Sequence, residues 1–346
     1  MQYTLRQLTY LVAVADHGSV TAAANALYTS QPGVSNAIAQ LEALFGLQFF
    51  VRHHARGVSP TPAGQSFIAA ARNLLLHAED LEQQAQEISQ SLRGAITLGC
   101  FTTMAPILLP DLLSALRDAY PELEVNLLEG DTQQLQAALL GGQIELALLY
   151  DLGLPETLHK QPLSGARPYV LVAADHPLAA RGQVSLAELV DEPLVLLDRP
   201  HSREYFLGLF RQLGLEPRVG HRTVNFELVR GLVAAHFGYA LLNLQPQVDM
   251  SYDGGKLACL DIVDDVPQLP IVLAWPQELT LTRKAAALRD TCLQLWGSST
   301  AQSPAAPINH LRRSSKSAKS AGSSLDGSLL AADGPSRRRL EGGRDD

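Results

Sequence analysis

The 346-residue sequence holds few cysteines and no long apolar run. Its three cysteines, Cys100, Cys259 and Cys292, lie far apart without CxxC spacing, which argues against a disulfide framework or a thiolate zinc site. We interpret them as buried structural thiols in a reducing compartment, with redox sensing by Cys100 as the alternative. No apolar run reaches the roughly eighteen residues of a membrane span, and the N-terminus lacks the small-residue cleavage site of a signal peptide. These absences predict a cytoplasmic protein.

Excess basic charge is also missing. The net charge of −8 argues against indiscriminate binding of nucleic acid, which usually needs a basic surplus. Residues 1–64 hold three arginines against Asp16 and Glu42, so each subunit can neutralise few phosphates. We find no GxSxG, HExxH or phosphate-loop motif and no paired Cys/His ligands. The sequence therefore predicts neither an enzyme nor a cofactor or metal site.

The most informative stretch is Ser19–Leu41, whose pattern predicts two short helices joined by a tight turn. We expect Thr21 to cap the first helix and Ser30 the second, with Pro32 in the first turn of the second. The second helix carries one apolar stripe formed by Val34, Ile38, Leu41 and Phe45. Its opposite side holds small or amide residues, namely Gln31, Ser35, Asn36 and Ala39. Such a helix can enter a DNA major groove, and an ordinary helical hairpin is the alternative.

The segment Leu47–Thr61 suits a β-hairpin wing beside this helix pair. A basic, Gly-containing turn lies between its two halves, and we expect Arg52 and Arg56 to meet phosphates there. The predicted DNA contacts are Thr21, Ser30, Gln31, Pro32, Ser35, Asn36, Arg52 and Arg56.

A long helix is predicted next, because Gln65–Arg93 contains no proline or glycine. Apolar residues alternate four and three apart over about four heptads, which is typical of a helix paired with a second helix. The alternative is an amphipathic helix packed on its own domain. The residues expected to carry dimerisation are Phe67, Leu74, Leu81 and Ile88.

From Gly94 the sequence alternates strands and helices. The pattern predicts strands at Ala95–Phe101, Leu123–Leu128 and Ile144–Tyr150, with helices at Ala105–Ala119 and Thr132–Leu140 between them. A second cycle runs from a strand at Tyr169–Ala173 through strands at Leu194–Leu197 and Arg218–Thr223 to one at Tyr239–Leu242. A strand at Ile271–Ala274 with a helix at Thr282–Trp296 closes the fold. This order implies a parallel sheet, two α/β lobes and a ligand in the cleft beyond the strand ends.

Polar residues at the predicted strand ends are the candidate contacts of a small organic effector. They comprise Thr102, Thr103, Tyr150, Arg199, His201, Ser202, Thr223, Asn225 and Asn243. Helix caps, turns and solvated loops use the same residue types and are the alternative. The abundance of hydroxyl, amide and arginine groups favours a polar or anionic molecule.

We expect four segments. Residues 1–64 form a winged helix-turn-helix domain, residues 65–93 a linker helix and residues 94–298 the two-lobed domain, with one lobe at roughly 94–164 plus 269–298 and the other at 165–268. Residues 299–346 are rich in Ser, Ala, Gly and Arg, hold eight basic against five acidic residues, and are expected to be disordered.

The N-terminal sixty residues resemble the DNA-binding domain of LysR-type transcriptional regulators. The resemblance rests on Leu8–Asp16, Gly18–Ala24, Leu27, Ser30–Ser35, Ile38, Leu41-Glu42, Gly46, Phe49-Phe50, Arg52 and Thr61–Gly64. The two-lobed part is similar to the effector domain of the same family, whose fold is related to periplasmic binding proteins, as far as about Gly297.

This resemblance implies a regulator that binds an imperfect DNA palindrome as a homodimer, assembles into tetramers, contacts RNA polymerase and responds to a small effector. The sequence departs from the family at Asn36, where a basic residue is frequent, and in its long tail. An α/β solute-binding protein, or an enzyme carrying a fused DNA-binding module, is the alternative.

Overall fold

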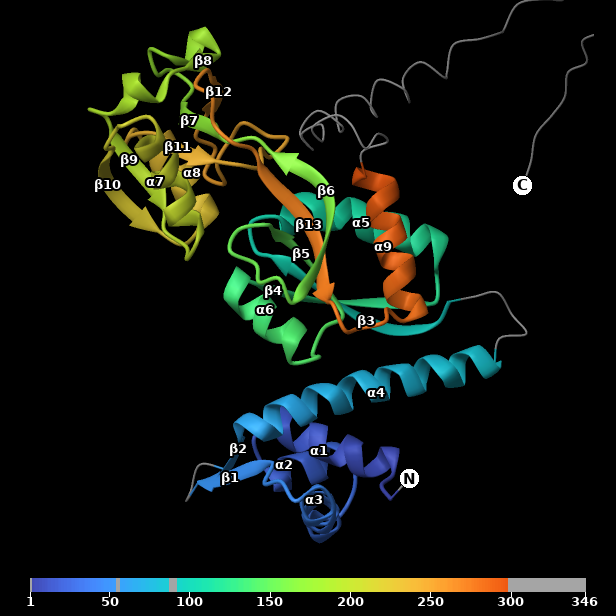
Figure 1. Ribbon diagram of the computed structural model, residues 1–346. Helices are drawn as coiled ribbons and strands as arrows, with labels where there is room; N and C mark the ends of the chain where they lie inside the picture. The colour runs from blue at the N-terminus through green and yellow to red at the C-terminus, as the bar shows by residue number, and fades with distance from the viewer. Residues whose placement is uncertain (1, 54–56, 87–91, 298–346) are drawn as a thin grey trace, which may run out of the picture.

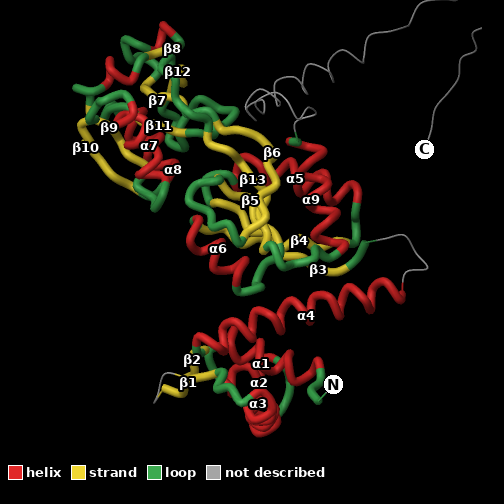
Figure 2. The backbone as a smooth tube through the Cα atoms, viewed as in Figure 1, coloured by secondary structure: helices red, strands yellow, loops and turns green. Residues whose placement is uncertain are grey.

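The computed structural model describes residues 2–53, 57–86 and 92–297 (Figure 1). We call residues 2–61 the head, residues 94–166 with 269–297 lobe 1, and residues 169–262 lobe 2. The long helix α4 lies between the head and lobe 1, and lobe 2 is on the far side of lobe 1. Figure 2 shows that helices dominate the head, whereas each lobe holds its own strands.

The head contains three helices and a small hairpin. The helices are α1 (Leu5–His17), α2 (Val20–Ala26) and α3 (Gln31–Phe45), and the strands β1 (Phe50–His53) and β2 (Gly57–Pro60) pair antiparallel as the predicted wing. Ser30 caps α3 as predicted, since its hydroxyl accepts from the Gly33 N–H at 3.2 Å. The predicted cap of α2 at Thr21 is wrong, because the extended Ser19 accepts from the Ala22 N–H and Thr21 already lies inside the helix.

The apolar side of α3 forms part of the core of the head. Val34, Ile38 and Leu41 are buried against α1 and α2, as the stripe predicts. Phe45, the last residue of the stripe, is instead 38% exposed, because it lies in the last turn of α3. Its ring still contacts Phe67 of α4, with centroids 4.7 Å apart.

Helix α4 spans Pro62–Gln86 and begins three residues earlier than predicted. Phe67 packs on the head of its own subunit, where its ring stacks on that of Phe49 with centroids 4.5 Å apart. At Phe67 the structure therefore supports the alternative interpretation of α4, a helix packed on its own domain. Leu74 and Leu81 are 40% and 66% exposed, so they remain available to a second helix. Ile88 lies outside the described residues. No helix in the described part of the chain is long and apolar enough to cross a membrane.

Lobe 1 is built on a five-stranded sheet of order β4-β3-β5-β13-β6. Its parallel strands are β3 (Gly94–Phe101), β4 (Leu123–Gly130) and β5 (Leu146–Tyr150). The expectation of a purely parallel sheet is wrong for β13 (Leu269–Pro276), which pairs antiparallel with both β5 and β6 (Leu158–Ala166), because β6 carries the chain to lobe 2 and β13 carries it back. The covering helices are α5 (Ala105–Ala119), α6 (Thr132–Leu140) and α9 (Arg283–Trp296).

Lobe 2 combines a four-stranded sheet of order β11-β7-β12-β8 with the parallel pair β9 and β10. These strands are β7 (Tyr169–Ala173), β8 (Gln183–Val184), β9 (Pro193–Leu197), β10 (Arg218–Thr223), β11 (Ala240–Leu242) and β12 (Leu257–Ile262). The helices are α7 (Ser202–Gln212), α8 (Phe226–Ala234) and the 3-10 turns η1 (Ala179–Arg181) and η2 (Leu186–Leu189). The sequence pattern predicted neither β6, β8 nor β12.

The division of α4 into a buried and an exposed part predicts different effects at its two ends. Phe67→Ala removes a ring from the head core and should lower the free energy of unfolding by about 2–4 kcal/mol. Leu81→Asp, at an exposed position, should change stability by less than about 0.5 kcal/mol yet abolish the dimer. Chemical denaturation and sedimentation velocity measure the two effects. A persistent Leu81→Asp dimer would show that the exposed stripe is not an interface.

Candidate functional site

The first candidate surface is the outer side of α3, which lies at the end of the head farthest from lobe 1 (Figure 1). Gln31 and Asn36 are exposed and Ser35 is half-buried, whereas Val34 and Leu41 on the opposite side are fully buried. The remaining predicted contacts on the helix pair, Thr21, Ser30 and Pro32, are exposed as well. The fold therefore leaves the amide and hydroxyl side of α3 uncovered within the subunit.

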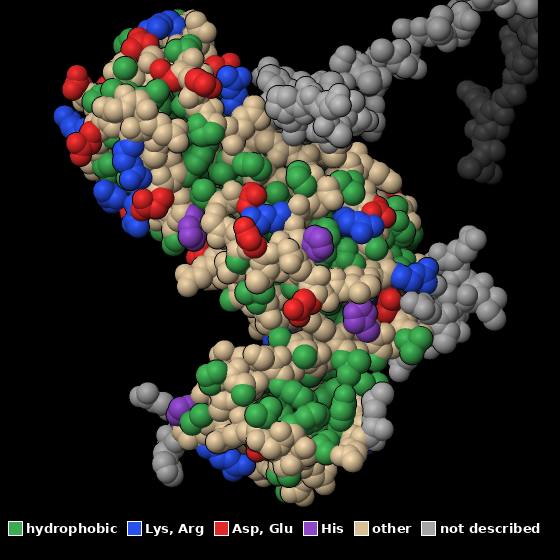
Figure 3. All heavy atoms as spheres, in the orientation of Figure 1, with side chains coloured by type: hydrophobic (Ala, Val, Ile, Leu, Met, Phe, Trp, Pro, Cys, Tyr) green, Lys and Arg blue, Asp and Glu red, His purple; other side chains and the backbone are tan. Residues whose placement is uncertain are grey.

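The wing is attached beside this surface. The Val58 N–H donates to the Gly18 carbonyl at 2.8 Å, so β2 is tied to the turn between α1 and α2. Across the hairpin, His53 Nε2 and Ser59 Oγ lie 2.7 Å apart. Arg52 is exposed on β1, and Arg56 lies outside the described residues. Figure 3 shows few charged side chains on the visible face of the head, in keeping with the low charge of residues 1–64.

The second candidate site is a small cavity where the two lobes meet. It is lined by Thr103, Tyr150, Leu197, Ser202, Phe206, Phe226, Leu242, Asn243 and Leu244. Thr103 follows β3 and Tyr150 ends β5, both in lobe 1, while Ser202 begins α7 and Asn243 follows β11. The free volume is about 10 Å³, roughly the space that one water molecule needs, so the cavity must widen before an organic molecule can enter.

Two polar groups give this cavity its chemistry. Burial raises the pKa of the Tyr150 hydroxyl, and a hydrogen bond with Thr103 partly offsets this effect, so the phenol stays protonated and can act as a donor. Asn243 Oδ1 is buried and has no hydrogen-bond partner within the described residues. A buried acceptor without a donor costs stability, and a ligand with an N–H or O–H group would satisfy it.

Four of the nine predicted effector residues thus line one cavity, and five do not. Thr102 donates its N–H to the Gly130 carbonyl at 3.1 Å. Arg199 Nε donates to the Val224 carbonyl at 2.8 Å, and His201 is exposed at the start of α7 with φ +63°. These local roles correspond to the turn and loop alternative.

Thr223 and Asn225 also have local partners. The Asn225 side chain caps α8, since its Oδ1 accepts from the Glu227 and Leu228 N–H groups at 2.9 Å. The Thr223 hydroxyl accepts from the Asn225 N–H at 3.2 Å. Both residues therefore shape the loop that brings Phe226 to the cavity.

Four apolar residues of the lining, Leu197, Phe206, Leu242 and Leu244, were not predicted from the sequence. Leu197 and Leu242 lie inside predicted strands, but nothing in the pattern marks Phe206 of α7, which reaches the cavity only through the packing of lobe 2. No charged side chain belongs to the lining. A negative charge on a ligand would be met by hydroxyl and amide groups and by the N-termini of α5 and α7.

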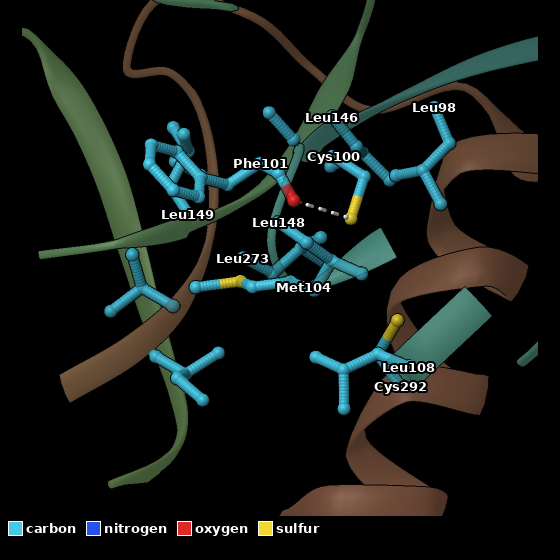
Figure 4. Packing of buried hydrophobic residues seen from close by; sticks show 14 of the residues in the cluster. Leu98, Cys100, Phe101, Met104, Leu108, Leu146, Leu148, Leu149, Leu273 and Cys292 are labelled. Atoms are coloured by element: carbon cyan, nitrogen blue, oxygen red, sulfur yellow. Dashed lines mark hydrogen bonds between the residues drawn. The ribbon is translucent and has the colours of Figure 1, made fainter. Parts of the chain in front are cut away.

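None of the three cysteines is among the residues that line this cavity. Cys100 and Cys292 are fully buried, and Figure 4 shows Cys100 among Leu98, Leu146 and Leu148, with its thiol directed at the Phe101 carbonyl. Burial raises the pKa of Cys100 to about 12, and burial together with the Asp249 carboxylate raises that of Cys259 to about 12. Burial also raises the pKa of Cys292. The described residues contain no cluster of His, Cys, Asp and Glu that could hold a metal ion.

Comparison with known proteins assigns both halves of the chain to one family. Residues 5–65 match the profile described as "Bacterial regulatory helix-turn-helix protein, lysR family", and residues 89–297 match the "LysR substrate binding domain". The DNA-binding transcriptional dual regulator OxyR of Escherichia coli is 32% identical over 239 residues, covering 69% of this chain and 78% of OxyR. The regulator CysB of Haemophilus influenzae is 30% identical over 241 residues, covering 69% of this chain and 75% of CysB.

Solved structures agree with these relatives. HinK of Pseudomonas aeruginosa, a LysR family transcriptional regulator, is 38% identical with a TM-score of 0.57, covering 84% of this chain and 98% of HinK. A full-length OxyR variant of Pseudomonas aeruginosa, in which aspartate replaces one cysteine, is 25% identical with a TM-score of 0.71, covering 85% of this chain and 95% of that one.

Proposed function

The chain belongs to the LysR family of bacterial transcriptional regulators, and we propose that it reads DNA bases through the outer side of α3 and is controlled by a small molecule bound in the interlobe cavity. It is a DNA-binding transcriptional regulator with an effector-binding domain. The observation that carries the proposal is the one-sided burial of α3, which leaves Gln31 and Asn36 uncovered.

The chemistry of the exposed groups supports direct contact with bases. Side-chain amides such as those of Gln31 and Asn36 can form paired hydrogen bonds with adenine in the major groove. The N-terminus of α3, with Ser30 and Ser35, offers hydrogen-bond donors to a phosphate. Thr21 on α2 is also exposed and can donate its hydroxyl proton to DNA. Arg52 and Arg56 of the wing supply the charge for neighbouring phosphates.

Assembly follows from the weak charge of one head. Because few phosphates are neutralised per subunit, two heads acting together are needed for tight binding. We propose that Leu74 and Leu81, followed by Ile88, pair two α4 helices, that the dimer binds an imperfect palindrome, and that dimers join into tetramers. We further propose that the regulator works in the cytoplasm and contacts RNA polymerase.

The polar groups of the proposed effector site are Thr103, Tyr150, Ser202 and Asn243, and the apolar residues of the cavity lining lie beside them. We propose a small organic molecule with an apolar body and a hydrogen-bond donor that meets Asn243 Oδ1. Thr102, Arg199, His201, Thr223 and Asn225 border this region and become contacts only if the cavity widens towards them.

Oxidation of a cysteine is not the proposed signal. Several relatives are named hydrogen peroxide-inducible genes activators, including one from Dickeya chrysanthemi that is 33% identical. The reactive form of cysteine is the thiolate, and burial raises the pKa of Cys100 and Cys259 to about 12, so both thiols stay protonated near pH 7. Burial of Cys100 and Cys292 also blocks access to an oxidant. No residue constellation in the described ranges supports a catalytic role either.

The DNA-binding proposal is tested by removing the amides from α3. Asn36→Ala and Gln31→Ala should each weaken binding to a DNA duplex selected by the wild-type protein from a random library by about tenfold, since a paired amide–base contact contributes about 1–3 kcal/mol. Gel shift measures the affinity and sedimentation the unchanged dimer. The controls are Asn126→Ala and Gln133→Ala, two exposed amides of lobe 1. Equal affinity in all four variants would exclude α3 as the reading helix.

The effector proposal is tested at Asn243. A thermal-shift screen of small organic molecules first supplies a ligand. Asn243→Leu should then weaken the affinity for that ligand at least tenfold, because the ligand loses its acceptor. The unliganded protein should be as stable as the wild type or more stable, because the substitution removes a buried acceptor that lacks a donor. Thr103→Val should also weaken binding, and Ser114→Ala on the outer part of α5 is the control. Unchanged calorimetric affinity in Asn243→Leu and Thr103→Val would place the ligand elsewhere.

A further inference from the structure

One side chain joins the head to lobe 1. Arg72 of α4 is largely buried, with 14% of its side chain exposed. Its Nη1 donates to the Gly141 carbonyl at 2.7 Å, at the C-terminal end of α6 in lobe 1. Its Nη2 forms an ion pair with Asp16 in the last turn of α1. The guanidinium therefore connects the end of a head helix with the end of a lobe helix, and each of its terminal nitrogens serves one partner.

The backbone of lobe 1 also presses directly on α4. Gly142 has φ +64°, and a Cβ atom there would lie 3.0 Å from the Ala69 carbonyl oxygen and 3.1 Å from Asn73 Oδ1. Only glycine accommodates both this conformation and this approach. Beyond it, burial raises the pKa of Glu145 in lobe 1, and hydrogen bonds from Thr282, then the charges of Lys284 and of His77 on α4, partly offset this effect. We call Arg72, Asp16, Gly141 and Gly142 the clasp. Figure 1 shows helix α4, which carries Arg72, between the head and lobe 1.

Helix α6 connects the clasp with the interlobe cavity. At its N-terminal end Asp131 caps the helix, and the preceding Gly130 carbonyl accepts from the Thr102 N–H, next to the cavity residue Thr103. Along its length Leu135 and Leu139 are buried against the sheet of lobe 1. A Cβ at Gly99 of β3 would lie 3.1 Å from Leu135, so helix and sheet are in close contact. A displacement at the cavity end of α6 must therefore move the clasp end as well.

We propose that Arg72 is a positioning residue whose clasp sets the orientation of the head relative to lobe 1 and couples that orientation to the width of the interlobe cavity. Arg72 touches neither the outer side of α3 nor the lining of the cavity. The coupling to the cavity rests on the proposed effector site. The role of the clasp in orienting the head does not depend on that site. Since coupling between two sites is reciprocal, a change at the clasp must be felt at the cavity even without a ligand.

The clasp is tested by measuring the distance between head and lobe in the full-length chain. Nitroxide labels are attached at Asn25→Cys on α2 and Glu124→Cys on β4, both exposed, in a Cys259→Ser background. Labelled chains are diluted with unlabelled ones so that only distances within a subunit contribute. The wild-type clasp should give one narrow distribution by pulsed electron resonance. Arg72→Gln and Gly142→Ala should each shift it or broaden it at least twofold.

Gly182→Ala is the matched control for Gly142→Ala. Gly182 has nearly the same backbone conformation, with φ +68°, but a Cβ there meets no atom within 4 Å. It should keep the narrow distribution. Circular dichroism confirms that the head is folded, and Gly142→Ala leaves the Arg72–Asp16 pair chemically intact in case Arg72→Gln unfolds the head. A wild-type distribution in the folded clasp variants would overturn the proposal.

The coupling is tested by hydrogen exchange of the same variants. The Thr102 and Met104 amides donate to the Gly130 and Phe101 carbonyls beside the cavity. In Arg72→Gln and Gly142→Ala these amides should exchange at least fivefold faster than in Gly182→Ala. Broadened distances with unchanged exchange would leave the clasp standing and overturn its link to the cavity. The Asn243 experiment measures effector binding and affects neither the label distance nor the hydrogen exchange. The clasp proposal and the effector-site proposal can therefore fail independently.

Discussion

Burial of one side of α3 against α1 and α2 is the constraint on which the proposed DNA recognition by this chain depends. Val34, Ile38 and Leu41 hold the helix by that side, and the same geometry turns Gln31 and Asn36 outwards. Ser30 fixes the helix start, and the bond between Val58 and Gly18 fixes the wing beside it. Because the head carries so little positive charge, the energy of specific binding must come from groups held in place rather than from bulk attraction to phosphate.

The regulatory half of the chain is organised by the strands that cross between the lobes. β13 runs antiparallel to its neighbours β5 and β6, and at the junction that β6 and β13 form between the lobes Tyr150 of lobe 1 lines the same narrow cavity as Ser202 and Asn243 of lobe 2. A cavity of about 10 Å³ cannot accept an organic molecule without movement of its walls. The Gly130 carbonyl before α6 accepts from Thr102, next to the cavity residue Thr103, and the Gly141 carbonyl at the other end of α6 accepts from Arg72. In our proposal, the widening that a ligand requires and the orientation of the head therefore both depend on α6.

Much of this architecture follows from local sequence pattern, and the rest depends on tertiary partners. The bounds of α5, α6, β7 and β10 agree with the pattern, because period and capping residues are local. The heptad spacing of α4 did not indicate that Phe67 packs on its own head. The strand pattern did not reveal the short strand β8, nor that the predicted strand within β13 runs antiparallel to its neighbours. At the cavity, strand-end position identified Thr103, Tyr150, Ser202 and Asn243. It did not separate them from Asn225, which caps a helix, or find Phe206, which arrives from the middle of one.

The most direct measurement of the central claim is protection of guanine N7 from methylation, since that atom lies only in the major groove. On a DNA duplex selected by the full-length protein, we expect protection in two segments of major groove on one face of the duplex, about one helical turn or a whole number of turns apart, one for each α3 of the dimer. Binding without any N7 protection, or with changes confined to the minor groove, would contradict the assignment of α3 as the helix that reads the bases.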